Sequence, residues 1–475
     1  MAGQPPARFP ALPSREDPDV AAASEVVGGP IGRRALLGSS IVNPIRAAVV
    51  VAIVGYAVAL LTRMPCVSDG FAGISRYTHL CYSDIPVLYG LRGFADGYPP
   101  YLDAADGQQV FEYPVLTGAM AQVGAWLTPI FGGGALGFYA ANLAMIGLLL
   151  IVTVVATGYT NPQRPTDAIL VAASPALLLP AAINWDMLPV ALVAVWLLLW
   201  SRRIVFWSGV VLGLAIAAKF YPLVFLGPLL VLCWRSGRLQ AFGRMLVGAV
   251  LAWSVANVPV MIANFDGWVT FYTFSSDRSE DFGSPWLALS IMGAGVPEDA
   301  INLAGIAAFG VACLAIAWFI WWAPVRPRLA PMLFLVLAAF LLTNKVYSPQ
   351  YMMWLLPLAV LALPRLRYLV IWQAGELIYF VAIWLYLAGL EDPDRGLPAG
   401  WYALAIWAHV GATLWFAAML VRISLRPDKD PVRVCDARNS AHGISGDPIG
   451  GVLDGAPDRF SARLLAERRA AAAHR

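Results

Sequence analysis

Hydrophobic residues along this chain gather in long runs, unlike the short alternating patterns of a soluble protein. About a dozen apolar runs fill residues 47–421, and polar loops separate them. A run of about 20 apolar residues is long enough to cross a bilayer as a helix. The pattern therefore predicts an all-α polytopic membrane protein with about twelve transmembrane helices, which start near residues 47, 136, 166, 187, 204, 222, 243, 299, 329, 351, 368 and 401.

Two apolar stretches break the alternation of spans and loops. Residues 113–131 are long enough to be a span, but counting them as one would reverse the side of every later loop. A re-entrant or surface-lying helix is therefore predicted there. Residues 286–294 are too short to cross and are predicted to form a half-helix at one face. The polar tails are residues 1–46 and 422–475, and their composition predicts disorder in the first tail and from Asp428 onward.

Composition supports a membrane protein, and the charge pattern orients it. Hydrophobic residues make up 59% of the 475 residues and charged residues 13%, against about 25% charged in a typical soluble domain. Short cytoplasmic loops carry an excess of Lys and Arg. The protein is therefore predicted to lie in the inner (plasma) membrane, with both tails and the arginine loops on the cytoplasmic side. Membrane lipids are expected as partners, and nucleic acid is not. These short loops hold one acidic residue and ten arginines, namely Arg164, Arg202, Arg203, Arg235, Arg238, Arg244, Arg326, Arg328, Arg365 and Arg367.

The longest loop of the opposite set, residues 63–112, is a candidate functional region. Loops longer than about 15 residues in compact proteins are usually functional. This one is rich in charged side chains, which include Asp84, Arg92, Asp103, Asp106 and Glu112. In an oxidising space its two cysteines, Cys66 and Cys81, either form a disulfide that closes the loop or remain free thiols.

Short motifs in the outward loops resemble glycosyltransferase family 87 in their order and spacing. The first loop offers a D-x-x-V-x-Y pattern from Asp84 to Tyr89, then Arg92-Gly93, Pro99-Pro100-Tyr101 and Glu112-Tyr113-Pro114. One departure is Leu88, which stands where the family usually has the first Tyr of a pair. Three later stretches follow the same family order, and they are Asn184-Trp185-Asp186, Lys219-Phe220-Tyr221-Pro222 and the run from Asn344 to Tyr351.

The resemblance implies a bundle of the GT-C type, in residues 47–421, with residues 63–112 as its catalytic outer loop. It implies transfer of a sugar from a polyprenyl-phosphate donor to an envelope glycolipid or polysaccharide on the extracytoplasmic face. The family points to decaprenyl-phosphate sugars and to actinobacterial envelopes. An inverting α-mannosyltransferase is expected first and an arabinofuranosyltransferase second. No cofactor is expected beside the lipid-linked donor.

Asp84 is the candidate general base, because the resemblance places the catalytic carboxylate in this loop. A carboxylate of ordinary pKa is ionised at neutral pH and can take the proton of an acceptor hydroxyl. The alternative is that the Ser83-Asp84 pair only caps a loop helix.

Four cations are candidates to hold the donor phosphate. Lys219 and Lys345 are the only lysines between the tails, and each ends an apolar run at the outer face. Arg278 and Arg92 lie in outer loops. A positive charge can hold a lipid phosphate. The alternatives are that the lysines only anchor span ends at the interface and that Arg278 forms an ordinary loop salt bridge.

Candidates to bind the sugar or the acceptor come from the same motifs. Asp186 can bind hydroxyls, or it can serve only as the carboxylate of a helix start. Glu376 lies inside a predicted span, where pairing with Gln373 is the plainer role. The remaining candidates are Asn184, Tyr221, Glu112, Tyr113, Asn344, Tyr347 and Gln350.

The charge of the leaving group determines whether a metal ion is expected. A single phosphate needs one or two cationic side chains, and no acidic pair or cysteine-histidine spacing suits a metal, so no metal is predicted. Two other classes remain as alternatives. One is a lipid or glycan transporter, which predicts internal repeats and charges at mid-membrane depth. The other is an inactive scaffold that keeps the GT-C bundle.

Overall fold

The computed structural model describes residues 43–102, 110–433 and 446–458. Helices dominate these residues, and the strands among them are the two-residue segments β1 (Asp281–Phe282) and β2 (Val346–Tyr347), which pair in parallel. Six helices are long and apolar enough to cross a membrane. They are α2 (Pro44–Leu61), α7 (Gly134–Thr160), α13 (Leu239–Ala263), α16 (Glu298–Trp322), α19 (Leu366–Glu391) and α20 (Ala399–Ser424).

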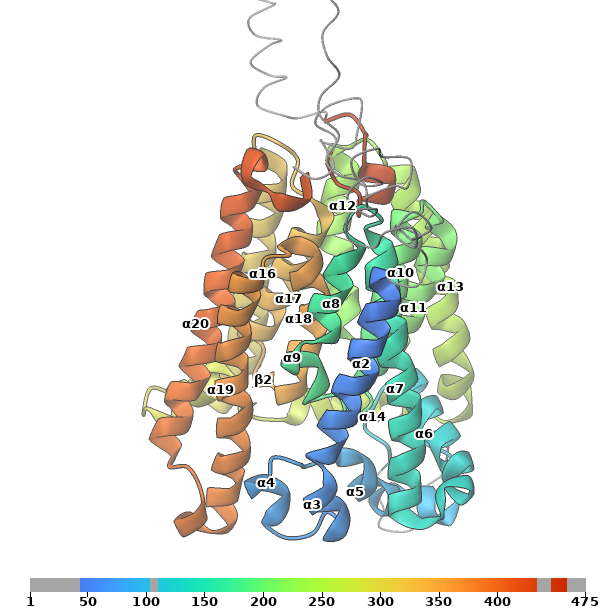
Figure 1. The fold of residues 1–475 in the computed structure, drawn as a ribbon, viewed down its shortest axis with the longest axis vertical. Coiled ribbons are helices and arrows are strands. Elements are labelled where there is room, and N and C mark those ends of the chain that lie inside the picture. The colour runs from blue at the N-terminus through green and yellow to red at the C-terminus, as the bar shows by residue number, and fades with distance from the viewer. Residues whose placement is uncertain (1–42, 103–109, 434–445, 459–475) are drawn as a thin grey trace, which may run out of the picture.

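Shorter apolar helices complete the bundle between these six. They are α6 (Val115–Leu127), α10 (Met187–Ser201), α11 (Val205–Ala218), α12 (Leu226–Arg235), α17 (Leu329–Thr343) and α18 (Met352–Ala362). Figure 1 shows most of the helices running along the long axis of the molecule. The predicted all-helical membrane fold is confirmed at this level, whereas the count of twelve spans stays a prediction.

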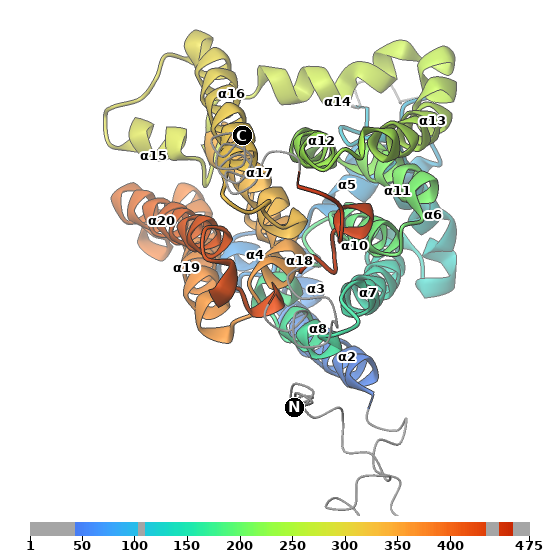
Figure 2. The same ribbon diagram turned by 90° about the horizontal axis from the view of Figure 1, so that it is seen from above.

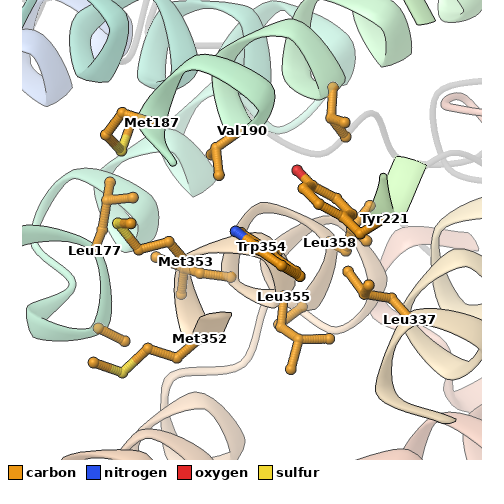
Figure 3. Packing of buried hydrophobic residues seen from close by; sticks show 14 of the residues in the cluster. Leu177, Met187, Val190, Tyr221, Leu337, Met352, Met353, Trp354, Leu355 and Leu358 are labelled. Carbon is orange, nitrogen blue, oxygen red and sulfur yellow. The ribbon is translucent and has the colours of Figure 1, made fainter. Parts of the chain in front are cut away.

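Every residue of α18 is buried, so this helix forms the centre of the bundle. A helix that is apolar on all sides needs apolar surroundings on every side, and for α18 the neighbouring helices provide them. Figure 3 shows its contacts: Trp354 lies beside Tyr221, and Leu355 lies toward Leu337 of α17. The rings of Tyr221 and Trp354 stack with centroids 4.3 Å apart. This packing holds two of the polar motifs, residues 219–222 and 344–351, next to the centre of the bundle.

The apolar run predicted to cross from residue 166 is broken in the structure. It forms two short helices, α8 (Ala168–Ala172) and α9 (Pro175–Leu178). The break falls at Ser174, whose backbone is extended (φ −77°, ψ 121°). A residue that precedes proline avoids the helical region, so Pro175 accounts for the interruption. The chain then turns through residues 179–186 and enters α10.

The two irregular apolar stretches form helices at the predicted places. Residues 115–127 form α6, which packs on α7 and α11. Its 13 residues span about 20 Å at 1.5 Å per residue, less than the thickness of a bilayer core. Residues 285–291 form the short α15 beside α20. Figure 2 also shows α14 (Phe265–Asp277), which the sequence did not predict, running between α13 and α16 at the edge of the bundle.

The outer loop folds over one end of the bundle. It contains α3 (Met64–Ser68), α4 (Ser75–Thr78) and α5 (Asp84–Leu91), which lie at the bottom of Figure 1. A disulfide joins Cys66 to Cys81, so of the two sequence-based alternatives the closed loop is present. Asp103 and Asp106 lie outside the described residues.

At the opposite end, residues 446–458 differ from expectation. Disorder was predicted from Asp428 onward, but this segment packs against the bundle, with Ile449 and Leu453 buried. The Trp200 indole donates to Gly450 O at 2.8 Å, and Arg235 forms an ion pair with Asp458 at 2.8 Å. The prediction is therefore wrong for residues 446–458. Composition did not reveal that the arginine loops would provide partners for these residues.

Candidate functional site

A cavity of about 1220 Å³ lies where the outer loop meets the bundle. Its wall combines the outer loop, the ends of α11 and α17, and the helices α14, α16 and α19. Nine of the residues singled out from the sequence line it, namely Asp84, Glu112, Tyr113, Asn184, Lys219, Tyr221, Arg278, Asn344 and Gln350. Motifs separated by up to about 260 residues therefore meet at one cavity.

Asp84 is the first residue of α5, and its neighbour Ser83 is the residue that caps the helix. The Ser83 hydroxyl accepts from Ile85 N at 3.3 Å and donates to Ile183 O at 3.1 Å. The Asp84 N–H donates to the same Ile183 carbonyl at 2.8 Å. Since Ser83 supplies the cap, the carboxylate of Asp84 is left to line the cavity.

Two tyrosine hydroxyls hold the Asp84 carboxylate. Tyr113 donates to Oδ2 at 3.0 Å, and Tyr82 also forms a side-chain hydrogen bond with the carboxyl group. Burial raises the pKa of Asp84 above its usual range, while these two hydrogen bonds and the charge of Lys219 act in the opposite direction. A carboxylate with a raised pKa is a stronger base, and that is the property a proton acceptor needs.

Lys219 faces the same tyrosine from the other side. Its ammonium group lies 4.7 Å from the ring centroid of Tyr113 and 2.9 Å from Asp186 Oδ1. Burial lowers the pKa of Lys219, but Asp186 more than offsets this, so the net direction is upward and the side chain stays charged. Asp186 is buried and also accepts from the Trp354 indole at 3.1 Å. It therefore orients Lys219 from behind rather than lining the cavity.

A second cationic region lies at the junction of α14 and α17. Arg278 lines the cavity, forms an ion pair with Asp281 and lies 5.6 Å from the ring centroid of Phe274. Lys345 donates to Ser276 O at 2.8 Å and lines a smaller adjoining pocket of about 200 Å³. Burial, followed by the charge of Arg278, lowers the pKa of Lys345.

Two of the predicted contacts are placed differently. Arg92 makes a two-pronged ion pair with Glu112, with N–O distances of 2.6 and 2.8 Å, and Glu112 rather than Arg92 lines the cavity. Tyr347 is buried and donates to Glu376 at 3.1 Å. Glu376 also accepts from Thr413 at 2.8 Å, whereas Gln373 accepts from Ser174, so the expected pairing of Glu376 with Gln373 is wrong.

Asn184 bridges two parts of the site. Its amide donates to Tyr113 Oη at 3.3 Å and its carbonyl accepts from Asp186 N at 3.0 Å. Tyr221 contributes a buried ring, and among the described residues nothing accepts from its hydroxyl. Through Tyr113 and Asp186, the hydrogen bonds of Asn184 connect the surroundings of Asp84 to those of Lys219.

An aromatic wall that the sequence did not reveal lies next to Asp84. It consists of Tyr77, Tyr82 and Trp384, with ring centroids 5.2 to 6.3 Å apart and planes within 31° of parallel. All three line the cavity, and within the described part of the chain no acceptor receives the Trp384 indole N–H. The chain is rich in aromatic residues, so no local signal separated these three from residues at the membrane interface.

No cluster of three or more His, Cys, Asp or Glu side chains suited to a metal occurs among the described residues. The charged groups of the cavity are two carboxylates, Asp84 and Glu112, and two cations, Lys219 and Arg278. This set can accept a proton at one place and hold a negative leaving group at another.

Comparison with known proteins shows which family and which relative the chain resembles. Residues 111–344 match glycosyltransferase family 87. A curated relative, GPI mannosyltransferase 1 of Eremothecium gossypii, is 27% identical over 187 residues, which cover 38% of this chain and 46% of the relative. The chain thus spans about half the length of the curated relative that it matches.

Proposed function

We propose that this protein, whose residues 111–344 match glycosyltransferase family 87, uses the cavity at Asp84 to transfer a sugar from a polyprenyl-phosphate donor to an envelope glycolipid or polysaccharide. The family match and the mannosyltransferase relative support a membrane glycosyltransferase. The single observation that supports the finer proposal is that Tyr113 contacts both Asp84 and Lys219, because a carboxylate and a cation are then close together at one cavity.

The proposed reaction is a single displacement. The acceptor hydroxyl attacks the anomeric carbon while Asp84 takes its proton, and the bond from that carbon to the phosphate oxygen breaks. The leaving polyprenyl phosphate carries the electron pair away, and attack from the opposite face inverts the anomeric centre. Lys219 and Arg278 would stabilise the charge on the phosphate, with Lys345 in reach of the adjoining pocket.

The apolar part of the cavity suits the donor lipid. Phe271, Phe274, Ile306 and Phe340 line it between α14, α16 and α17. The smaller pocket shares Ile306 and Phe340 with it and extends the apolar surface along α16. α16 is also the least buried of the long helices, with 6% of its apolar window inside the protein. A prenyl chain could therefore enter from the membrane beside α16.

The acceptor would lie against the aromatic wall. Aromatic rings offer an apolar face to the C–H side of a sugar, and polar groups at their edges fix its orientation. The carboxylate of Glu112 lines the same cavity and provides such a group. Mannose is the proposed sugar because the relative is a mannosyltransferase, and arabinofuranose is the second candidate. In the proposed orientation the cavity opens on the extracytoplasmic face of the membrane, and both termini lie in the cytoplasm.

The test is transfer by the purified full-length protein in lipid. Radiolabelled polyprenyl-phosphomannose and, separately, polyprenyl-phosphoarabinose would be offered with an envelope glycolipid extract. We expect transfer by the wild type and a loss of about 10²-fold or more in Asp84→Asn, since a base contributes about 10²–10⁴-fold.

The matched control is Asp69→Asn, the same exchange at an exposed position of the same loop, and it should keep full activity. Transfer by Asp84→Asn at the wild-type rate would reject Asp84 as the base. Transfer of neither sugar by the wild type would reject the donor class.

A further inference from the structure

A pocket of about 200 Å³ lies at the other end of the bundle, where α19 begins and α20 ends. This is the upper left end in Figure 1. Five cationic side chains line it, namely Arg365, Arg367, Arg422, Arg426 and Lys429. The other lining residues are apolar or aromatic, so within the described ranges no carboxylate lines the pocket.

Orientation in the membrane explains arginines in short loops, but it does not explain why these five converge on one hollow. The pocket includes the start of α19, where unpaired backbone N–H groups already carry a partial positive charge. Arg365 is the N-cap of that helix, Arg367 lies in its first turn, and the turn contains no acidic residue. These cations repel the helix end unless an anion lies between them.

The contacts inside the chain hold two of the cations without neutralising them. Arg365 donates to the backbone carbonyl of Lys429 at 3.0 Å, and Arg367 donates to the Tyr368 hydroxyl at 3.1 Å. The nearby carboxylate of Asp430 is occupied, because Arg328 binds both of its oxygens at 2.7 and 3.1 Å. Among the described residues, none of the five cations that line the pocket forms an ion pair with a carboxylate.

The surroundings favour an anion attached to a lipid over one dissolved in water. Tyr368 stacks on Trp415 with ring centroids 5.6 Å apart, an aromatic pair of the kind found at membrane interfaces. Next to it the surface of α19 is apolar, with Leu366 and Val370 exposed. A headgroup in the pocket would thus have its acyl chains against these side chains.

We propose that this pocket, defined by Arg365, Arg367, Arg422, Arg426 and Lys429, binds the phosphodiester headgroup of an anionic phospholipid. The site is separate from the cavity at Asp84 and does not depend on the proposed reaction. Basic pockets between membrane helices bind anionic headgroups in this way. The guanidinium groups would donate to the phosphate oxygens, and the start of α19 would add its backbone N–H groups.

Native mass spectrometry of the full-length protein in detergent, titrated with phosphatidylglycerol or phosphatidylcholine, tests this site. We expect the wild type to prefer phosphatidylglycerol, and the double variant Arg422→Gln/Arg426→Gln to lose about tenfold or more of that affinity. The double variant Arg422→Lys/Arg426→Lys keeps the charge, so it should retain most of the affinity and shows that the first result is not a failure to fold.

The matched control is Arg238→Gln/Arg244→Gln, which removes the same charge from exposed positions at the start of α13, outside the pocket. An equal loss in this control would overturn the proposal, since it would show a general attraction to basic loops. Displacement of bound phosphatidylglycerol by millimolar inorganic phosphate would also overturn it in favour of a soluble anion. Retention of lipid at that phosphate concentration supports it.

Discussion

Tyr113 contacts two of the four charged groups of the cavity, Asp84 and Lys219. Its hydroxyl donates to Asp84 at 3.0 Å and receives the Asn184 amide at 3.3 Å, while its ring lies against Lys219. A hydrogen bond to a carboxylate stabilises the charged form and lowers its pKa. Tyr113 therefore limits how far burial can raise the pKa of Asp84, so Asp84 is more fully ionised at neutral pH than burial alone would allow.

The first prediction concerns Tyr113→Phe, which removes this hydroxyl and keeps the ring. The pKa of Asp84 should rise further. Since the base must be deprotonated to act, the acidic limb of the pH profile of kcat/KM should move to higher pH by about one unit. At pH values below this limb the activity of the variant should fall, whereas at pH values well above it the activity should be nearly retained. The measurement is the pH dependence of sugar transfer.

Tyr89→Phe is the control for this prediction. Tyr89 lies on the same helix as Asp84 and stacks on Phe138, with ring centroids 4.8 Å apart. Among the described residues Tyr89 makes no hydrogen bond to Asp84, so its variant should leave the acidic limb in place. An unchanged limb in Tyr113→Phe would mean that the limb reports some group other than Asp84.

At this scale the sequence predicted the charged residues of the site better than the aromatic ones. Asp84 and Lys219 were recognisable because charges are rare in this chain and family motifs surround them. Trp384 was not, because it lies in an apolar helix about 300 residues from Tyr82 and meets it only in the folded protein. Asp186 was recognised as a candidate, but its pairing with Lys219 depends on the meeting of two helices.

Among the elements, residues 446–458 connect more helices than their length suggests. Arg203 at the α10–α11 turn donates to Gly451 O at 3.2 Å, and Leu329 N at the start of α17 donates to Asp447 at 2.9 Å. Gly451 has a positive φ of 60°, and a Cβ there would lie 2.0 Å from the Trp200 carbonyl oxygen. The segment can therefore approach α10 only with glycine at this position.

The second prediction compares two glycines of this segment. Gly451→Ala should displace the segment, lower the thermal unfolding temperature by several degrees and speed protease cleavage between residues 434 and 458. Gly455→Ala is the matched control, because φ there is also positive (68°) but a Cβ meets nothing within 4 Å. It should cost only the backbone strain, of about 1 kcal/mol. Equal effects in the two variants would show that the close approach to Trp200 does not matter.

Elements were predicted well where hydropathy alone decides them and poorly where neighbours decide them. The long helices follow from their apolar runs, and the break between α8 and α9 could have been read from Pro175. The helix α14 has a mixed composition, so its run gave no signal. Residues 446–458 depend on arginines located more than 100 residues earlier, and composition cannot register such a partner.

For the whole molecule, the main feature is a cavity that extends from the loop of residues 63–112 to the exposed surface of α16. Ile306 of α16 lines both the cavity and the adjoining pocket, and 70% of it is exposed. This position marks the proposed entrance for the prenyl chain. The global arrangement could not be derived from the sequence, because segments from residue 77 to residue 387 share one wall.

The third prediction concerns this entrance. Ile306→Trp should raise the KM for a long-chain polyprenyl-phosphate donor by about tenfold, which corresponds to about 1.4 kcal/mol of lost binding, because the larger indole would occupy part of the entrance. It should change the KM for a short-chain donor much less. Ile262→Trp on α13, where the residue is 81% exposed and lines neither pocket, is the control and should affect neither donor. An equal rise in KM for both donors would mean that the prenyl chain does not bind beside Ile306.

The ion pair between Arg235 and Asp458 also sets an order of events during biosynthesis. The two residues are 223 positions apart, and the Arg235 side chain is buried in the finished protein. At about 5–20 residues per second, a ribosome needs roughly 10 to 45 s to go from one to the other. During that interval the α12 end stays open to water and lipid headgroups. A nascent chain released early would keep this end unsealed, so a quality-control protease could recognise incomplete copies by it.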